Sequence, residues 1–267
     1  MSTAILISGQ LRTFAKCWPT QRWQVLRHFA DPHFFITVQD GPEIQLTDDL
    51  KREYGADRVH VDGRTDPDLS SLLTPELAAA YHRAPYANAA PAHQLLLQHW
   101  YQNECWKNFE SCTREIPARR EKIVRYDEHR EPNGSMEIEV PIRFDTIIRM
   151  RADLWFHSFE PADADSVYPS ECFTPPWGEF GGINDRFAIM GPTAARYYFG
   201  VFEAIPELLA AGCPFHPESL VAANLERGNV TINRTLKAFF STERLDGTRR
   251  WPEITPMDML NASLRAA

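Results

Sequence analysis

Three short apolar runs mark the first sixty residues as a strand-rich region. TAILIS (3–8) and HFFITVQD (33–40) are apolar enough to be buried strands, and RVHVDG (58–63) is a third, shorter candidate. Between the first two runs, PTQRWQVLRHF (19–29) has helical spacing through Trp23, Leu26 and Phe29, with Pro19 opening it. A strand, a helix and a strand within about forty residues form a βαβ unit, which predicts a parallel sheet with helices on its faces.

The middle of the chain predicts one long helix and one hairpin. Residues 63–91 are rich in Asp, Pro, Ser and Ala and resemble loop with short helical turns, whereas 92–116 has apolar residues three and four apart. Residues 121–144 alternate between polar and apolar on both sides of Pro-Asn-Gly at 132–134, which is typical of a hairpin. We interpret this hairpin as an insertion into the sheet.

The last third predicts shorter elements around glycine-rich loops. RFAIM (186–190) is a short strand, 193–212 is an amphipathic helix that stops at Gly212, and 213–232 is a loop, a helix and a short strand. We divide the chain into one domain over 1–245, with a first part at about 1–157 and a second part at about 158–245. Residues 246–267 are a tail.

The stretch FDTIIRMRADLWF (144–156) carries charges inside an apolar run. As a single strand it would place Ile148, Met150, Ala152, Leu154 and Phe156 on one face, and Ile147, Arg149, Arg151, Asp153 and Trp155 on the other. Either the charges compensate one another at a sheet edge, or they line a site. The flanking sequence is too apolar for a simple edge, which favours a site.

Composition narrows the class of protein. The net charge of −8 and the absence of a dominant basic region argue against a general nucleic-acid binder. No apolar run approaches the roughly 20 residues of a membrane-spanning helix, so we expect no transmembrane segment and leave peripheral membrane contact open. The N-terminus has no signal-peptide pattern, and five scattered cysteines without a C-x-x-C pair indicate neither disulfides nor zinc. These features predict a cytoplasmic protein.

The sequence lacks the common nucleotide-binding and hydrolase motifs. There is no G-x-x-x-x-G-K-[ST], G-x-G-x-x-G, H-E-x-x-H or G-x-S-x-G. Ligands of open α/β sheets instead bind at the carboxyl ends of the strands. The polar residues expected there are Ser8, Gly9, Gln10, Arg12, Asp40, Arg149, Arg151 and Asp153. Glycine allows close backbone approach, arginine suits phosphate, and aspartate suits a metal or ribose hydroxyls, so this set predicts a site for a nucleotide diphosphate.

Four motifs resemble a known family. ISGQLRTF, DTIIRMRADLWF, GGINDRFAIMG and HPESLVAANLERG, in this order between about residues 4 and 235, look like bacterial and giant-virus surface-polysaccharide glycosyltransferases with the GT-A fold. The resemblance implies an α/β, Rossmann-like GT-A domain with a mostly parallel sheet. It also implies that the part at about 1–157 binds a nucleotide-sugar donor and that the part at about 158–245 binds a glycan or glycolipid acceptor.

The central motif departs from that family. The family commonly has Asp-x-Asp, which binds a divalent metal that bridges the donor diphosphate, whereas this chain has Arg151-Ala152-Asp153. An arginine there could neutralise diphosphate charge in place of part of the metal. Dependence on Mn²⁺ or Mg²⁺ stays open, with Asp153 and His216 as the candidate ligands.

The resemblance also implies catalytic residues. Glu218 stands where inverting members of the family carry their base, just inside the helix of HPESLVAANLERG, and Asp185 is the competing base. A carboxylate in the first helical turn feels the positive end of the dipole, which we expect to keep Glu218 ionised, although the same position also suits a simple helix cap. We assign acceptor binding to Trp177 and Asn184.

The sequence therefore predicts a glycosyltransferase that works by inverting single displacement. Two alternatives remain: a nucleotidyltransferase, which would normally carry a glycine-rich, lysine-bearing loop near its start, and a non-catalytic module that binds sugar nucleotides or glycans.

Overall fold

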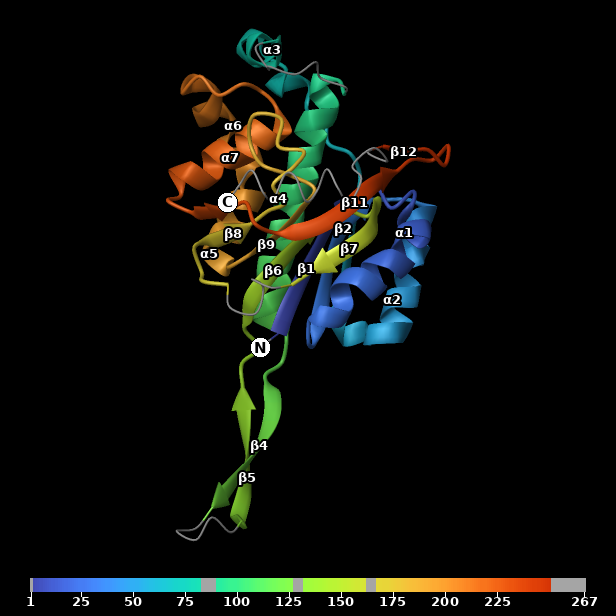
Figure 1. Ribbon diagram of the computed structural model, residues 1–267, viewed down its shortest axis with the longest axis vertical. Coiled ribbons are helices and arrows are strands. Elements are labelled where there is room, and N and C mark those ends of the chain that lie inside the picture. The colour runs from blue at the N-terminus through green and yellow to red at the C-terminus, as the bar shows by residue number, and fades with distance from the viewer. Residues whose placement is uncertain (1, 83–89, 127–131, 162–166, 251–267) are drawn as a thin grey trace.

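The computed structural model describes residues 2–82, 90–126, 132–161 and 167–250, and it is built around a seven-stranded, mostly parallel sheet (Figure 1). The strands lie in the order β10-β8-β9-β6-β1-β2-β3, with bounds β1 Ser2–Gly9, β2 Pro32–Gln39, β3 Val59–Arg64, β6 Phe144–Met150, β8 Glu171–Phe173, β9 Phe187–Met190 and β10 Thr231–Asn233. β1 pairs in parallel with β2 and β6, whereas β9 runs antiparallel to β6 and β8. The predicted α/β class with a mostly parallel sheet is confirmed.

Helices cover both faces of this sheet. On one face lie α3 Pro75–His82, α4 Ala92–Glu115, α5 Pro192–Phe199, α6 Val201–Ala210 and α7 Pro217–Arg227. On the other lie α1 Phe14–Thr20, α2 Thr47–Tyr54 and a three-stranded sheet of β7 Leu154–Glu160, β11 Lys237–Glu243 and β12 Arg249–Arg250. Short helical turns fill the connections, at η1 Gln21–Val25, η2 Leu26–His28, η3 Pro42–Leu46, η4 Ala56–Arg58 and η5 Ser70–Leu72.

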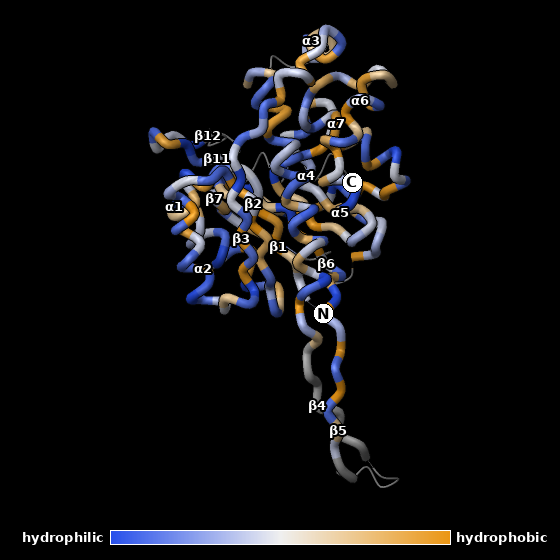
Figure 2. Tube along the Cα trace, turned by 180° about the vertical axis from the view of Figure 1, so that it is seen from behind, coloured by the Kyte–Doolittle hydropathy of each residue, from blue (hydrophilic) through white to orange (hydrophobic). Residues whose placement is uncertain are grey.

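Alternation along β1 explains why the sheet has two cores. Ala4 and Leu6 pack on the α4 side, and Ile5 and Ile7 pack on the α1 side, all fully buried. Figure 2 shows the same strands as a hydrophobic centre between more polar outer elements. Apolar side chains on both faces are what a parallel strand covered by helices needs.

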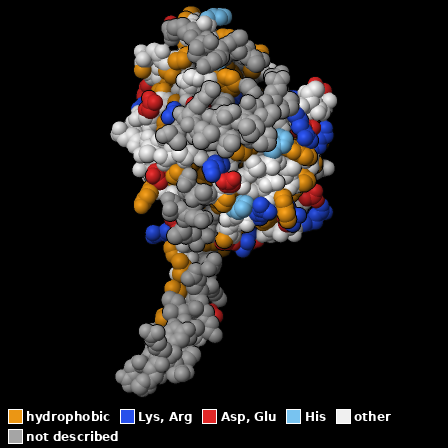
Figure 3. Space-filling model, viewed as in Figure 1, with side chains coloured by type: hydrophobic (Ala, Val, Ile, Leu, Met, Phe, Trp, Pro, Cys, Tyr) orange, Lys and Arg blue, Asp and Glu red, His pale blue; other side chains and the backbone are white. Residues whose placement is uncertain are grey.

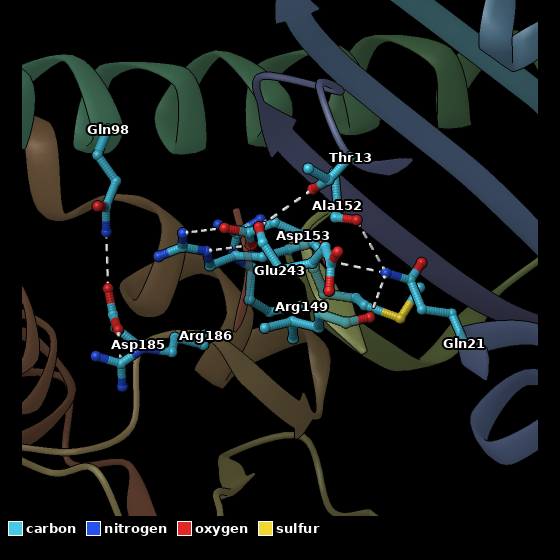
Figure 4. A network of polar contacts seen from close by, with 12 residues as sticks. Thr13, Gln21, Gln98, Arg149, Ala152, Asp153, Asp185, Arg186 and Glu243 are labelled. Atoms are coloured by element: carbon cyan, nitrogen blue, oxygen red, sulfur yellow. Dashed lines mark hydrogen bonds and ion pairs between the residues drawn. The ribbon is translucent and has the colours of Figure 1, made fainter. Parts of the chain in front are cut away.

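Residues 144–156 do not form one strand, contrary to the prediction. β6 ends at Met150, residues 151–153 turn out of the main sheet, and β7 pairs with β11 of the smaller sheet. The fully buried side chain of Gln21 donates to the carbonyl oxygens of Arg151, Ala152 and Leu154 at 3.3, 3.1 and 3.0 Å, and these bonds stabilise the turn (Figure 4). Arg149 therefore shares a face with Ile147, but Arg151 and Asp153 do not continue that row.

Two predicted helices also differ in detail. The first begins at Phe14 rather than Pro19 and changes to π-helical spacing over η1, which leaves Trp23 65% exposed instead of packed. The helix expected over 193–212 is interrupted at Gly200, between α5 and α6. Both differences change local spacing and leave the layer arrangement as predicted.

The inserted hairpin is confirmed, with a different turn. β4 Arg119–Tyr126 and β5 Pro132–Val140 pair only with each other and project from the body of the molecule (Figure 1). Pro132, Asn133 and Gly134 belong to β5 and do not form the predicted turn, and residues 127–131 lie outside the described residues. Of the predicted tail, 246–250 leads into β12 and the rest also lies outside the described residues.

The surface over α1 and α2 carries charges of both signs, as Figure 3 shows. Ion pairs there include Arg22–Glu53, Lys51–Asp48 and Arg52–Asp49. Within the described part of the chain, no helix is long and apolar enough to cross a membrane.

Candidate functional site

A cleft of about 980 Å³ opens at the carboxyl edge of the main sheet. Its floor includes the ends of β1 and β6, which are neighbours in the sheet although the chain first runs outward through β2 and β3. The strand order reverses at β1, because β2 and β3 lie on one side of it and β6 on the other, and ligand crevices of open α/β sheets form at such a switch point. The position of the cleft therefore follows from strand order.

Seven of the eight residues predicted to bind a donor line this cleft: Ser8, Gly9, Gln10, Arg12, Arg149, Arg151 and Asp153. Asp40 is not among the lining residues, and its backbone amide instead donates to the carbonyl oxygen of Arg64 at 2.8 Å. Gly9 ends β1 with a φ of +105°, a conformation that other residues rarely adopt, and that bends the chain along the cleft.

Arg151 and Asp153 form a bidentate ion pair at the cleft wall. Nε and Nη2 of Arg151 donate to the two carboxylate oxygens of Asp153 at 2.9 and 2.6 Å. Burial on its own would lower the pKa of Arg151, but the Asp153 carboxylate raises it above its ordinary value. The two charges compensate each other, as one of the two interpretations of the sequence expected, although in a turn and not at a sheet edge.

The candidate metal ligands do not assemble a metal site. Both oxygens of Asp153 are engaged by Arg151, and Nδ1 of His216 lies 3.2 Å from the carboxylate of Glu218. Among the described residues, no group of three or more His, Cys, Asp or Glu side chains could hold a metal ion. The donor set here does not fit Mn²⁺ or Mg²⁺, which need several oxygen ligands.

Behind the cleft lies a buried carboxylate cluster. Nη2 of Arg186 donates to Glu218 at 3.0 Å, and Nη1 of Arg186 lies 3.9 Å from Asp185. Glu218 and Asp185 are 4% and 3% exposed, so the charges interact with little solvent screening. Neither carboxylate lines the cleft.

The pKa values of the two carboxyl groups are pushed in opposite directions. Burial, and then the charge of Asp185, raise the pKa of Glu218 to about 8, which outweighs the lowering effect of Arg186. Burial on its own would raise the pKa of Asp185 too, but Arg186, Arg151 and the hydrogen bond from Gln98 bring it below its ordinary value. The expectation that the helix end keeps Glu218 ionised is therefore wrong, because desolvation is the larger effect. Such a divided pair is what acid–base chemistry uses.

A tightly turned loop fixes this cluster against the start of α7. A side-chain carbon at Gly182 would lie 2.0 Å from the carbonyl oxygen of Glu218, so only glycine allows this approach. The amide of Ile183 donates to the same oxygen at 3.2 Å. The loop thus holds Glu218 by its backbone as well as by its side chain.

The two residues predicted to bind an acceptor have bonds within the protein. Asn184 is fully buried, donates to the carbonyl oxygen of Trp177 at 2.9 Å and accepts from the amide of Arg186 at 3.0 Å. The indole of Trp177 donates to the carbonyl oxygen of Ala238 at 3.0 Å. These bonds brace the loop, and acceptor binding by Trp177 and Asn184 stays a prediction.

Gln98 of α4 joins the cleft to the cluster, and the sequence did not single it out. It lines the cleft, and its amide donates to Asp185 at 2.7 Å (Figure 4). Four more cleft residues, Gln10, Gln39, Asp66 and Tyr101, form a hydrogen-bonded chain with distances of 2.9, 3.0 and 2.6 Å. Of these only Gln10 was predicted, although Gln39 ends a predicted strand and could have been found from that position.

Comparison with known proteins adds no relative: neither the scan against protein-family models nor the search of curated proteins finds a match.

Proposed function

We propose that the protein is a glycosyltransferase of the GT-A type that moves a sugar from a nucleotide diphosphate to a glycan or glycolipid acceptor. The observation that carries the proposal is the cleft at the switch point between β1 and β6, lined by Gly9 and by Arg12, Arg149 and Arg151. Cationic side chains beside a glycine turn suit a diphosphate. The four resembling motifs and the mostly parallel sheet support the GT-A assignment.

The proposed reaction is a single displacement with inversion. Glu218 accepts the proton of the acceptor hydroxyl, whose oxygen forms a bond to the anomeric carbon of the donor sugar. The bond from that carbon to the diphosphate oxygen breaks, and its electron pair leaves with the diphosphate. Arginines in the cleft stabilise the negative charge that develops on this leaving group.

The raised pKa of Glu218 agrees with a role as base. A carboxylate with a pKa near 8 is a stronger proton acceptor, once ionised, than an ordinary glutamate. Because Glu218 is only 4% exposed, an acceptor reaches it only after loop 177–186 moves. The proposal therefore includes opening of this loop during the reaction cycle.

Metal has a minor role in this proposal. Arg151 stands where a first aspartate would hold the ion, and it engages Asp153 through both oxygens. The charge of the leaving diphosphate is then met by arginine, and no step is assigned to a metal.

A second candidate is a non-catalytic module that binds sugar nucleotides. One observation favours it: Asp185 and Glu218 lie outside the cleft lining, so they are available for loop structure alone. In that case the cleft binds a donor without transfer.

Product analysis distinguishes these readings. The protein is incubated with a panel of nucleotide sugars, with and without simple alkyl glycosides as acceptors, and released nucleoside diphosphate and pyrophosphate are measured. Release of nucleoside diphosphate that acceptor stimulates supports the glycosyltransferase. Pyrophosphate release supports a nucleotidyltransferase, and binding without any release supports the module.

A further inference from the structure

Arg149 is a buried cation without a counter-ion among the residues that the structure describes. It is 1% exposed and is the largest of the fully buried side chains, yet it forms part of the cleft lining. Among the described residues, no Asp or Glu oxygen lies within 4.0 Å of its guanidinium, and its Nε has no hydrogen-bond partner. Within the described part of the chain, the hydrogen bond of this side chain is from Nη1 to the carbonyl oxygen of the next residue, Met150, at 3.4 Å.

The groups around Arg149 do not supply the missing charge. Burial raises the pKa of Tyr198 well above its ordinary value and that of Cys105 to about 12, and burial lowers the pKa of His99 to about 4, so all three are neutral at pH 7. The hydroxyl of Tyr198 and Nε2 of His99 are also buried, and neither has a hydrogen-bond partner in the described ranges.

Besides burial, two charged groups act on the pKa of Arg149: Arg151, which lowers it, and Asp185, which raises it. Asp185 already accepts from Gln98 and faces Arg186. Among the described residues, no carboxylate is therefore left to balance the positive charge of Arg149.

A buried, uncompensated cation is costly for a folded protein. Transfer of a charge from water to a protein interior costs several kcal/mol unless a partner replaces the lost hydration. If no ligand binds there, an apolar side chain of similar size would stabilise the core more than Arg149 does. Functional sites commonly retain such local costs, because the ligand later supplies the missing interaction.

Arg151, unlike Arg149, already has an anionic partner. Its guanidinium has both fork nitrogens bonded to Asp153 and is 25% exposed. A ligand that recruits Arg151 must first compete with a bidentate carboxylate, whereas a ligand at Arg149 displaces no anion.

We infer that Arg149, and not Arg151, is the principal binding residue for the diphosphate group of a ligand in the cleft. The inference rests on the proposed function for the nucleotide part of that ligand. A guanidinium presents parallel N–H donors that match two phosphate oxygens, and the low dielectric around Arg149 strengthens this contact. The chemical class that the residue recognises is a condensed phosphate, shared by a nucleoside diphosphate and free pyrophosphate.

The test uses three variants of the full chain: Arg149→Met, Arg149→Lys and, as the matched control, Arg151→Met. Binding of pyrophosphate, of four nucleoside diphosphates (UDP, GDP, CDP and ADP) and of the corresponding nucleosides is measured by calorimetry, and melting temperature is measured without ligand. Loss of a charge-assisted contact predicts that Arg149→Met weakens diphosphate binding by about tenfold to a hundredfold. Arg151→Met should weaken it less, and Arg149→Lys should retain part of the affinity.

The melting temperature separates a binding role from a structural one. Arg149→Met should raise the melting temperature of the ligand-free protein, because it removes the uncompensated charge while filling a similar volume. A lower melting temperature together with unchanged diphosphate affinity would overturn the inference. If Arg149→Met does not fold, the inference is tested with Arg149→Lys and with a structure of the wild-type protein bound to pyrophosphate. A phosphate group bound away from Arg149 in that structure would overturn the inference.

The outcomes also separate this inference from the proposed function. If the wild-type protein binds pyrophosphate through Arg149 but binds no nucleoside diphosphate, the anion site stands and the donor assignment is wrong. If the wild-type protein and Arg149→Met bind a nucleoside diphosphate with equal affinity, the donor assignment stands and the role of Arg149 is wrong. If wild-type protein binds neither pyrophosphate nor any nucleoside diphosphate, both are wrong.

Discussion

The cleft and the buried cluster each contain an arginine–carboxylate pair, but in opposite surroundings. In the cleft, Arg151 and Asp153 are 25% and 20% exposed, whereas Arg186 and Glu218 in the cluster are 12% and 5% exposed. Partial hydration makes the first pair less costly to separate than the second. Burial makes the second pair costly to break and moves the pKa of Glu218 to about 8. We propose that the cleft serves recognition and the buried cluster proton transfer.

The largest expected effect is on turnover, through Glu218. Glu218→Gln keeps the shape of the side chain but removes the proton acceptor, so the rate should fall by roughly 10²–10⁴-fold, the usual scale of general base catalysis. Donor affinity should stay unchanged, because Glu218 lies outside the cleft lining. Acceptor-dependent release of nucleoside diphosphate measures the rate.

Two further variants sharpen this result. Glu226→Gln changes an exposed glutamate of the same helix and should leave the rate unchanged. Asp185→Asn should reduce the rate less than Glu218→Gln. If Asp185→Asn stops turnover and Glu218→Gln does not, the two residues exchange roles.

The second effect is on stability, through Arg186. Arg186→Met leaves two carboxyl groups buried without their cation and should lower the free energy of unfolding by about 3–5 kcal/mol. Urea unfolding at pH 9, above the pKa of Glu218, measures the full loss.

Two other arginines test whether burial causes the large loss of stability expected for Arg186→Met. Arg234 bonds to Glu179 in the same loop but is 44% exposed, and Arg151 pairs in the cleft, so methionine at either position should cost about 1 kcal/mol or less. Equal losses for all three arginines would contradict the contrast between the two regions.

The third effect is a pH dependence. The base must be ionised to act, and with a pKa of about 8 it is mostly protonated at pH 6, so turnover should rise by about tenfold per pH unit up to pH 8 and then level off. Arg186→Met should move the midpoint upward, because the Arg186 charge lowers the pKa of Glu218. A flat profile between pH 6 and 9 would remove Glu218 as the base.

The smallest expected effect is that of metal removal. Because Arg151 engages both oxygens of Asp153, most turnover should persist after exhaustive chelation. Complete loss on chelation, with full recovery on addition of Mn²⁺ or Mg²⁺, would show that the cleft binds a metal that this arrangement of side chains does not suggest.

The cleft could be predicted from the sequence because strand ends are local signals. Apolar runs identify β1 and β2, and residues that follow them, such as Gly9 and Arg12, necessarily reach the same edge of a parallel sheet. The burial of Arg149 could not be predicted, because it depends on neighbours from other elements, such as Tyr198.

The turn after β6 and the buried cluster were harder for the same reason. Gln21 lies about 130 residues before the carbonyl groups that it binds, and no local pattern pairs them. The contact between Arg186 and Glu218 likewise depends on the close approach of Gly182 to α7. The composition of the loop predicts turns, but not what the loop packs against.

One measurement tests the central claim, that the cleft between β1 and β6 holds a nucleoside diphosphate. The wild-type protein is screened by thermal shift against UDP, GDP, CDP and ADP, and its structure is determined with the one that raises the melting temperature most. The account predicts the diphosphate within hydrogen-bond distance of Arg149 and beside Gly9, with the nucleoside toward Gln39 and Asp66. A nucleoside diphosphate bound outside this cleft, or the absence of a shift with all four, would contradict it.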